Sequence, residues 1–202
     1  MTNNYRKDEK LKQRLNAFLI ETFELPNADY YGKMEQKHFL GLKSVLSDIN
    51  NALTMRLALG FIDWVRENLP LDEIECNQVR KKVLSTKPSA NGYDVASLSF
   101  IAEVKCNVPV NGAERYGAAQ KDGIIRDIES LLKGKSKAKP VKARCLKFMV
   151  FLDLREVHKA NDHLIESNSK ISKEFFILKP GDIPNNPDVV YGVYVPFNDL
   201  KL

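Results

Sequence analysis

Two acidic residues and one lysine in a short, mostly apolar stretch are the side chains best placed to do chemistry. The stretch reads Gly-Tyr-Asp-Val-Ala-Ser-Leu-Ser-Phe-Ile-Ala-Glu-Val-Lys from Gly92 to Lys105. Because side chains alternate between the two faces of a strand, Glu103 and Lys105 share one face. Charge inside so apolar a strand is costly unless it is paired or binds a metal. Gly92 and the Ser97–Ser99 segment permit a hairpin, which would bring Asp94 back beside Glu103.

These two carboxylates predict a site for Mg²⁺, with Mn²⁺ as a possible substitute. Magnesium is typically held by one or two carboxylates together with waters and substrate phosphate. The backbone carbonyl of Val104 could be a further ligand. A metal ion at Asp94 and Glu103 could generate a hydroxide nucleophile and neutralise the charge of a scissile phosphate. Lys105 would then position or activate the attacking water, or stabilise the charge that develops on the phosphorane.

An acid two residues before a lysine is common in this chain. The same spacing recurs at Asp8/Lys10, Glu35/Lys37 and Asp199/Lys201. Three features distinguish Glu103 and Lys105 from these pairs: the apolar strand around them, Asp94 upstream, and the helix expected downstream.

The elements that must position these residues follow from apolar spacing and from turn residues. Helices are expected at about Tyr5–Phe23, Leu42–Asn68, Glu114–Lys133 and Arg155–Ser167. Strands are expected at about Ile74–Val83, Gly92–Ser97, Leu98–Cys106, Leu146–Leu154, Phe175–Leu178 and Val189–Val195. Apolar residues four apart, from Val45 to Val65, form a stripe along the longest helix that should face a core. Strands mixed with helices predict an α/β fold, with a mixed sheet flanked by helices.

The order helix, three strands, helix, strand over about Leu42–Leu154 resembles the core of PD-(D/E)XK nucleases. This superfamily includes many type II restriction enzymes and DNA-repair nucleases. The resemblance covers over half of the chain and implies that Asp94 is the first motif acid, Glu103 the second and Lys105 the motif lysine. Tyr93 stands where the proline of the motif would be. The implied fold is a restriction-endonuclease-like αβββαβ core with N-terminal helical and C-terminal β additions.

The helix expected at Glu114–Lys133 adds two candidate residues. Gln120 is the polar member of an apolar stripe, and a buried amide needs hydrogen-bond partners. It either faces the active site, as polar residues on this helix do in several related nucleases, or caps the backbone of a neighbouring strand. Lys121 beside it contacts phosphate or is a surface lysine. On the preceding helix, Glu67 with Asp63 behind it is a candidate for the acid that many related nucleases place there, or a solvated charge.

Positive charge is concentrated in two segments of the chain. The sequence holds 31 Lys and Arg against 26 Asp and Glu, a formal net charge of +5. Seven basic and no acidic residues lie from Lys133 to Lys147, and a second basic cluster consists of Arg80, Lys81, Lys82 and Lys87. Such a cluster raises the local concentration of a polyanion, although a solvated loop is the alternative. The predicted contacts to the DNA backbone are Arg80, Lys81, Lys82, Lys121, Lys135, Lys137, Lys139 and Lys142.

Composition places the chain among ordinary globular proteins. Its 44% hydrophobic and 28% charged residues predict a single domain over residues 1–202, with the nuclease-like core at about 42–154. No apolar run is long enough to cross a bilayer, and the N-terminus lacks the apolar core of a signal peptide. We therefore expect a cytoplasmic protein with no membrane partner. Cys76, Cys106 and Cys145 form no Cys-x-x-Cys pair and are expected to be reduced thiols.

Together these features favour a metal-dependent DNA endonuclease, most like a small type II restriction enzyme. A duplex cutter of this size would need two active sites, which predicts a two-fold homodimer. One alternative is a repair or recombination nuclease that acts on branched or single-stranded DNA. Another is a non-catalytic DNA-binding or interaction module, in which Glu103 and Lys105 form a structural salt bridge.

Overall fold

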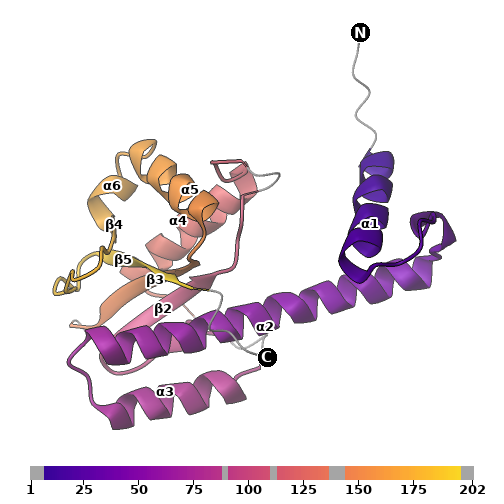
Figure 1. Ribbon diagram of the computed structural model, residues 1–202. Coiled ribbons are helices and arrows are strands. Elements are labelled where there is room, and N and C mark those ends of the chain that lie inside the picture. Colours follow the sequence, from indigo (N-terminus) through magenta and orange to yellow (C-terminus); the bar gives the residue numbers. More distant parts are fainter. Residues whose placement is uncertain (1–6, 88–90, 110–112, 137–143, 197–202) are drawn as a thin grey trace. The chain divides into compact units, whose positions relative to one another are not determined.

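The computed structural model describes residues 7–87, 91–109, 113–136 and 144–196 (Figure 1). The chain divides into two compact units, Met1–Ile49 and Asn50–Leu202. The division falls inside helix α2 (Gln36–Asn68), which contributes residues to both units. The candidate residues from Asp94 onward all lie in the second unit.

The first unit is helical, and hydrogen bonds from polar side chains connect its parts. It contains α1 (Lys7–Phe23), the short helix η1 (Tyr31–Lys33) and the first part of α2. Asn16 of α1 donates to Asp29 Oδ1 over 3.0 Å and accepts from the backbone N–H of the first η1 residue over 2.8 Å. These bonds attach α1 to the loop that precedes η1.

The apolar stripe of α2 is buried only along its second part. Leu57, Phe61 and Val65 are fully buried. Val45, Leu46 and Ile49 are exposed by 53%, 51% and 48% of their surface. The expectation that the whole stripe faces a core is therefore wrong for its first part, because a regular apolar repeat does not reveal where the packing partners of the helix end.

The second unit is built on a five-stranded mixed sheet with strand order β1-β2-β3-β5-β4. Its strands are β1 (Val95–Ala96), β2 (Phe100–Lys105), β3 (Leu146–Leu152), β4 (Phe175–Ile177) and β5 (Val190–Val195). β1 pairs antiparallel with β2, and the other pairs are parallel. The predicted α/β class with a mixed sheet flanked by helices is confirmed.

Helices cover both faces of the sheet (Figure 1). On one face lie the second part of α2 and α3 (Glu73–Ser85), and on the other lie α4 (Ala118–Lys133), α5 (Arg155–Glu166) and α6 (Ile171–Glu174). Alternate side chains of β2 point to opposite faces of the sheet. Phe100 packs in the core beneath α2, and Ile101 packs in the core beneath α4. The three cysteines are free thiols, as expected.

The strand expected at Ile74–Val83 is wrong, because these residues lie in helix α3. Asp72 caps this helix by accepting a hydrogen bond from Ile74 N over 3.0 Å. The acidic residues in its first turn interact favourably with the positive end of the helix dipole. The buried residues Cys76 and Val79 are three apart, which is helical spacing. The elements therefore run α2, α3, β1, β2, α4, β3, and the αβββαβ core is not confirmed.

Candidate active site

The hairpin between β1 and β2 places Asp94 across from Glu103. The strands pair with Val95 opposite Ala102 and Ala96 opposite Ile101. Extending this register by one position sets Asp94 opposite Glu103. Residues directly opposite each other in an antiparallel pair have Cβ atoms about 4.5–5.5 Å apart. The tight hairpin on which the assignment of the first acid depended is therefore present.

The turn of this hairpin is held by hydrogen bonds from its own serines and from α3. Ser97 Oγ accepts from Ser99 N and Phe100 N over 3.0 and 2.9 Å. Glu75 of α3 accepts from Leu98 N and Ser99 N over 3.1 Å each, and from the Ser99 hydroxyl over 3.0 Å. These contacts fix the length of the turn and with it the register that brings the two acids together.

Asp94 is bonded to the backbone of β2. Its Oδ2 accepts from Val104 N over 2.8 Å. Although Asp94 as a whole residue is exposed, its carboxyl group faces the protein, and burial of that group raises its pKa. The N–H and C=O of one strand residue point to the same edge, so the Val104 carbonyl also points toward the side of Asp94.

Glu103 is a buried carboxylate with a lysine against it. Its exposed fraction is 5%, and Lys135 Nζ lies 2.6 Å from its Oε1. The same ammonium donates to Gly92 O over 2.6 Å and lies 5.2 Å from the centre of the Tyr93 ring. Burial first, and then the nearby Asp94 carboxylate, raise the pKa of Glu103 to about 7, although Lys135 acts to lower it.

Lys105 forms an ion pair with Asp127 of α4. Both side chains are about one-fifth exposed, at 21% and 22%. Lys105 therefore shares the α4 face of β2 with Glu103, as strand alternation predicted. Among the described residues the partner of Glu103 is Lys135 and that of Lys105 is Asp127, so the direct Glu103–Lys105 salt bridge of the non-catalytic alternative is not formed.

Gln120 uses both ends of its amide on backbone groups. Its Nε2 donates to Val108 O over 3.1 Å, and its Oε1 accepts from Gly117 N over 3.2 Å. The side chain thus joins the first turn of α4 to the segment that follows β2. This arrangement matches the backbone-capping alternative, and the amide is not aimed at Asp94 or Glu103.

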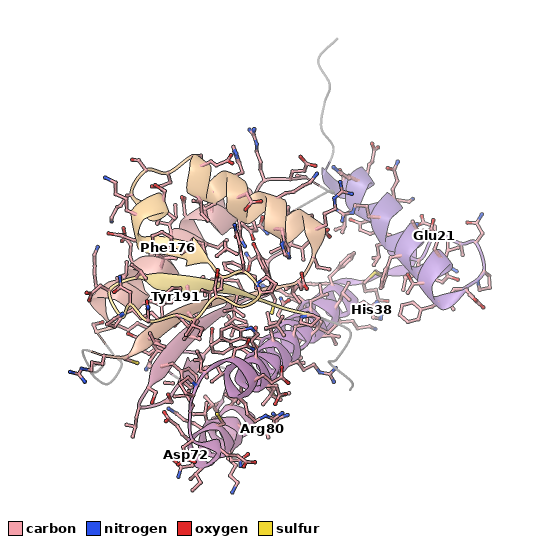
Figure 2. The ribbon with its side chains drawn as sticks, turned by 60° about the vertical axis from the view of Figure 1, so that its left-hand side comes forward. Glu21, His38, Asp72, Arg80, Phe176 and Tyr191 are labelled. Carbon is pink, nitrogen blue, oxygen red and sulfur yellow. The ribbon has the colours of Figure 1, made fainter. Side chains whose placement is uncertain are left out.

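The predicted DNA contacts are dispersed. Arg80, labelled in Figure 2, donates to Asp63 of α2 over 2.8 Å, which leaves Asp63 in an ion pair. Lys81, Lys82 and the candidate helix acid Glu67 are exposed. Lys135 lies in the candidate site rather than in a free loop. Lys137, Lys139 and Lys142 lie outside the described residues.

The oxygen donors are of the kind that magnesium accepts. Asp94 and Glu103 supply carboxylates and Val104 a carbonyl, a sparse set of the kind magnesium accepts because it keeps several waters. No group of three or more His, Cys, Asp or Glu side chains able to hold a metal ion occurs within the described ranges. The Lys135 ammonium lies beside Glu103 and offsets part of the negative charge of the two carboxylates.

The sequence did not predict a role for Asp127 or the contact of Lys135 with Glu103. Asp127 follows Gln120 by seven residues, a spacing that puts both on the same side of a helix. That spacing indicates a shared helix face but does not identify Lys105 as the partner. Lys135 was assigned to a basic DNA-binding segment because its partners Gly92 and Glu103 lie far away in the sequence.

In comparisons with protein-family models, curated proteins and solved structures, no family model, curated protein or solved structure matches this chain. Within the ranges that the structure describes, no helix combines the length and the apolar character needed to span a bilayer.

Proposed function

We propose that this protein is a metal-dependent endonuclease that hydrolyses phosphodiester bonds in DNA, most like a type II restriction enzyme. The observation that carries the proposal is the β1–β2 hairpin. Its register places Asp94 opposite Glu103, and Lys105 follows two residues later on the same face. This arrangement supports the proposal, because it brings the two motif acids and the lysine to one part of the sheet.

Each side chain has a distinct role in this proposal. Asp94 and Glu103, with the Val104 carbonyl, would hold Mg²⁺ or Mn²⁺, which supplies a nucleophilic hydroxide and charge neutralisation when bound. Lys105, oriented by Asp127, positions the attacking water or stabilises charge on the phosphorane. Charge-assisted pairing keeps the Lys105 ammonium in a defined position, which such stabilisation requires.

The test is cleavage of plasmid DNA with Mg²⁺ or Mn²⁺ by native protein, Glu103→Ala and Lys105→Ala. Two matched controls remove the same types of charge from the surface of α4: Glu129→Ala and Lys133→Ala, which pair with each other over 3.5 Å. Each site variant should lose activity by about 10²-fold or more, and each control should stay near native. Cleavage that survives in folded Glu103→Ala would refute the proposal.

The same samples test the finer proposals. Comparison of linear, nicked and branched DNA separates a restriction-like enzyme from a repair or recombination nuclease. A duplex cutter should elute as a homodimer, at least on DNA, because one site cuts one strand. A monomer in gel filtration both with and without DNA would count against the restriction-like reading.

A second candidate is a DNA-binding or interaction module in which the charges are structural. Its support is that both site charges already have partners, Glu103 with Lys135 and Lys105 with Asp127. In that case Mg²⁺ should leave thermal stability unchanged, because a cation that does not bind the folded state cannot stabilise it. A thermal unfolding scan with increasing Mg²⁺ decides between the two, since binding at Asp94 and Glu103 would raise the melting temperature.

A further inference from the structure

A pocket lies between the N-terminal part of α4 and the second half of α5. Its volume is about 150 Å³. Its polar lining consists of Arg115, Lys121, His163 and Ser167, and its apolar lining includes Tyr116 and Leu164. Three of the four polar residues are basic, and no acidic residue lines the pocket.

The basic residues of this pocket, Arg115, Lys121 and His163, have no ion-pair partner among the described residues, and the neighbouring Glu114 carboxylate interacts with the charge of Arg115 without forming such a pair. Other lysines of the same region are paired, since Lys159 pairs with Glu114 and Lys170 pairs with Glu129. Unpaired basic groups that converge on one concave surface attract anions.

The wall of the pocket is fixed before any ligand arrives. The hydroxyl of Tyr116 donates to Asn161 Oδ1 over 3.1 Å, and Asn161 is fully buried. Asn161 in turn donates to the Tyr194 hydroxyl over 3.1 Å. This chain of hydrogen bonds positions the backbone next to Arg115, so less entropy is lost when an anion is bound there.

The N-terminus of α4 adds to the positive electrostatic potential at the pocket. Gly117, the residue that precedes the helix, offers no side-chain cap, and the first turn holds no acidic residue. The positive end of the α4 dipole therefore lies next to the pocket.

The pocket is separate from the candidate active site. At 100° per residue, Lys121 and Asp127 flank the buried stripe of Ile124 and Ile128 on opposite sides of α4. Asp127 forms an ion pair with Lys105, whereas Lys121 lines the pocket. The ligand of the pocket therefore does not depend on the metal chemistry proposed for Asp94 and Glu103.

We propose that this pocket binds a phosphate group. Arginine offers paired donors that match phosphate oxygens, lysine adds a point charge, and histidine and serine supply further donors. The phosphate belongs either to the backbone of a nucleic acid or to a small phosphorylated molecule. The chemistry is the same in both cases, and the experiment separates the two sources.

The first arm measures binding of inorganic phosphate by ¹H–¹⁵N NMR, without divalent metal. The test variant is Arg115→Gln with Lys121→Gln. The control, Arg126→Gln with Lys173→Gln, removes two charges from exposed positions on α4 and α6. Phosphate should shift the amide signals of residues 115–121 and 163–167 in native protein and control. The affinity of the test variant should fall by about tenfold or more, as expected when charge-assisted hydrogen bonds are lost.

The second arm measures DNA binding by fluorescence anisotropy at several salt concentrations. If DNA supplies the phosphate, the slope of log K against log salt should be smaller by about 1.8 in the test variant, the value for two lost contacts. The control should change less. A loss of phosphate binding with unchanged DNA binding supports a small phosphorylated ligand.

Equal behaviour of test variant and control in both arms would overturn the phosphate site. Glu103→Ala is run in parallel to keep the two proposals distinct. It should bind phosphate like native protein, whether or not the nuclease proposal survives. Loss of phosphate binding in folded Glu103→Ala would also count against a separate pocket.

Discussion

Replacing Glu103 by glutamine should remove a large part of the pH dependence of folding stability. Glu103 is 5% exposed, and its pKa is raised from 4.5 to about 7. In the unfolded chain the carboxyl group loses its proton near pH 4.5, and in the folded protein only near pH 7. Between these values the folded state binds more protons, so the free energy of unfolding falls as pH rises.

The size of this effect follows from the two pKa values. The interval from 4.5 to about 7, at roughly 1.4 kcal/mol per unit, gives a loss of about 3 kcal/mol. The stabilisation is fully present below pH 4.5, declines between pH 4.5 and 7, and is constant above pH 7. Glu103→Gln has no proton to release there. The difference in stability between native protein and variant should therefore change by about 3 kcal/mol over that window.

The assay is urea unfolding of both proteins from pH 4 to 8 in buffer that contains a chelator. The control is Glu129→Gln, since hydrogen bonding to Lys170 and the charge of Lys133 lower the pKa of this exposed carboxyl. Its contribution should have the opposite sign. Parallel stability curves for native protein and Glu103→Gln across the window would refute the reasoning, because Glu103 could then not be a buried acid with a raised pKa.

Three further substitutions test the contacts around the site. Lys135→Met should raise the pKa of Glu103 above about 7, because it removes the ammonium that favours the charged carboxylate; an NMR titration of the glutamate carboxyl carbon measures it. Asp127→Asn leaves the Lys105 ammonium without its counter-charge and should cost about 1–3 kcal/mol in urea unfolding, with Asp122→Asn, at an exposed position on the same helix, staying near native. Tyr116→Phe removes a hydrogen bond to a buried amide and should cost about 1–2 kcal/mol in the same assay; an unchanged midpoint would mean that the bond does not form.

Local patterns predicted the elements near the site well. Alternation of side chains along residues 98–106 correctly assigned Glu103 and Lys105 to one face of β2. Gly92 and the serine-containing turn correctly indicated the hairpin that returns Asp94. Both predictions rest on contacts between residues close in the sequence, which local rules describe.

Predictions were less accurate where the structure depends on contacts between residues far apart in the sequence. The segment Ile74–Val83 was predicted as a strand, yet its capping aspartate and its burial against α2 make it helix α3. The sequence does not show that Lys135 turns back onto Glu103 or that Asp127 of α4 meets Lys105. Such pairings are set by how α4 packs on the sheet, and short-range periodicity carries no information about it.

The charge balance of the candidate site bears on the choice between a catalytic and a structural role. Lys105 and Asp127 pair with each other, and among the described residues the ammonium that pairs with one of the Asp94 and Glu103 carboxylates is that of Lys135. The pKa values of both carboxyl groups are raised, which is what a buried pair with too little positive charge should show. A purely structural pair is expected to be fully matched, since uncompensated buried charge is destabilising. With both carboxyl groups ionised, the described residues therefore leave this pair short of one positive charge, which supports the proposal that a cation binds there.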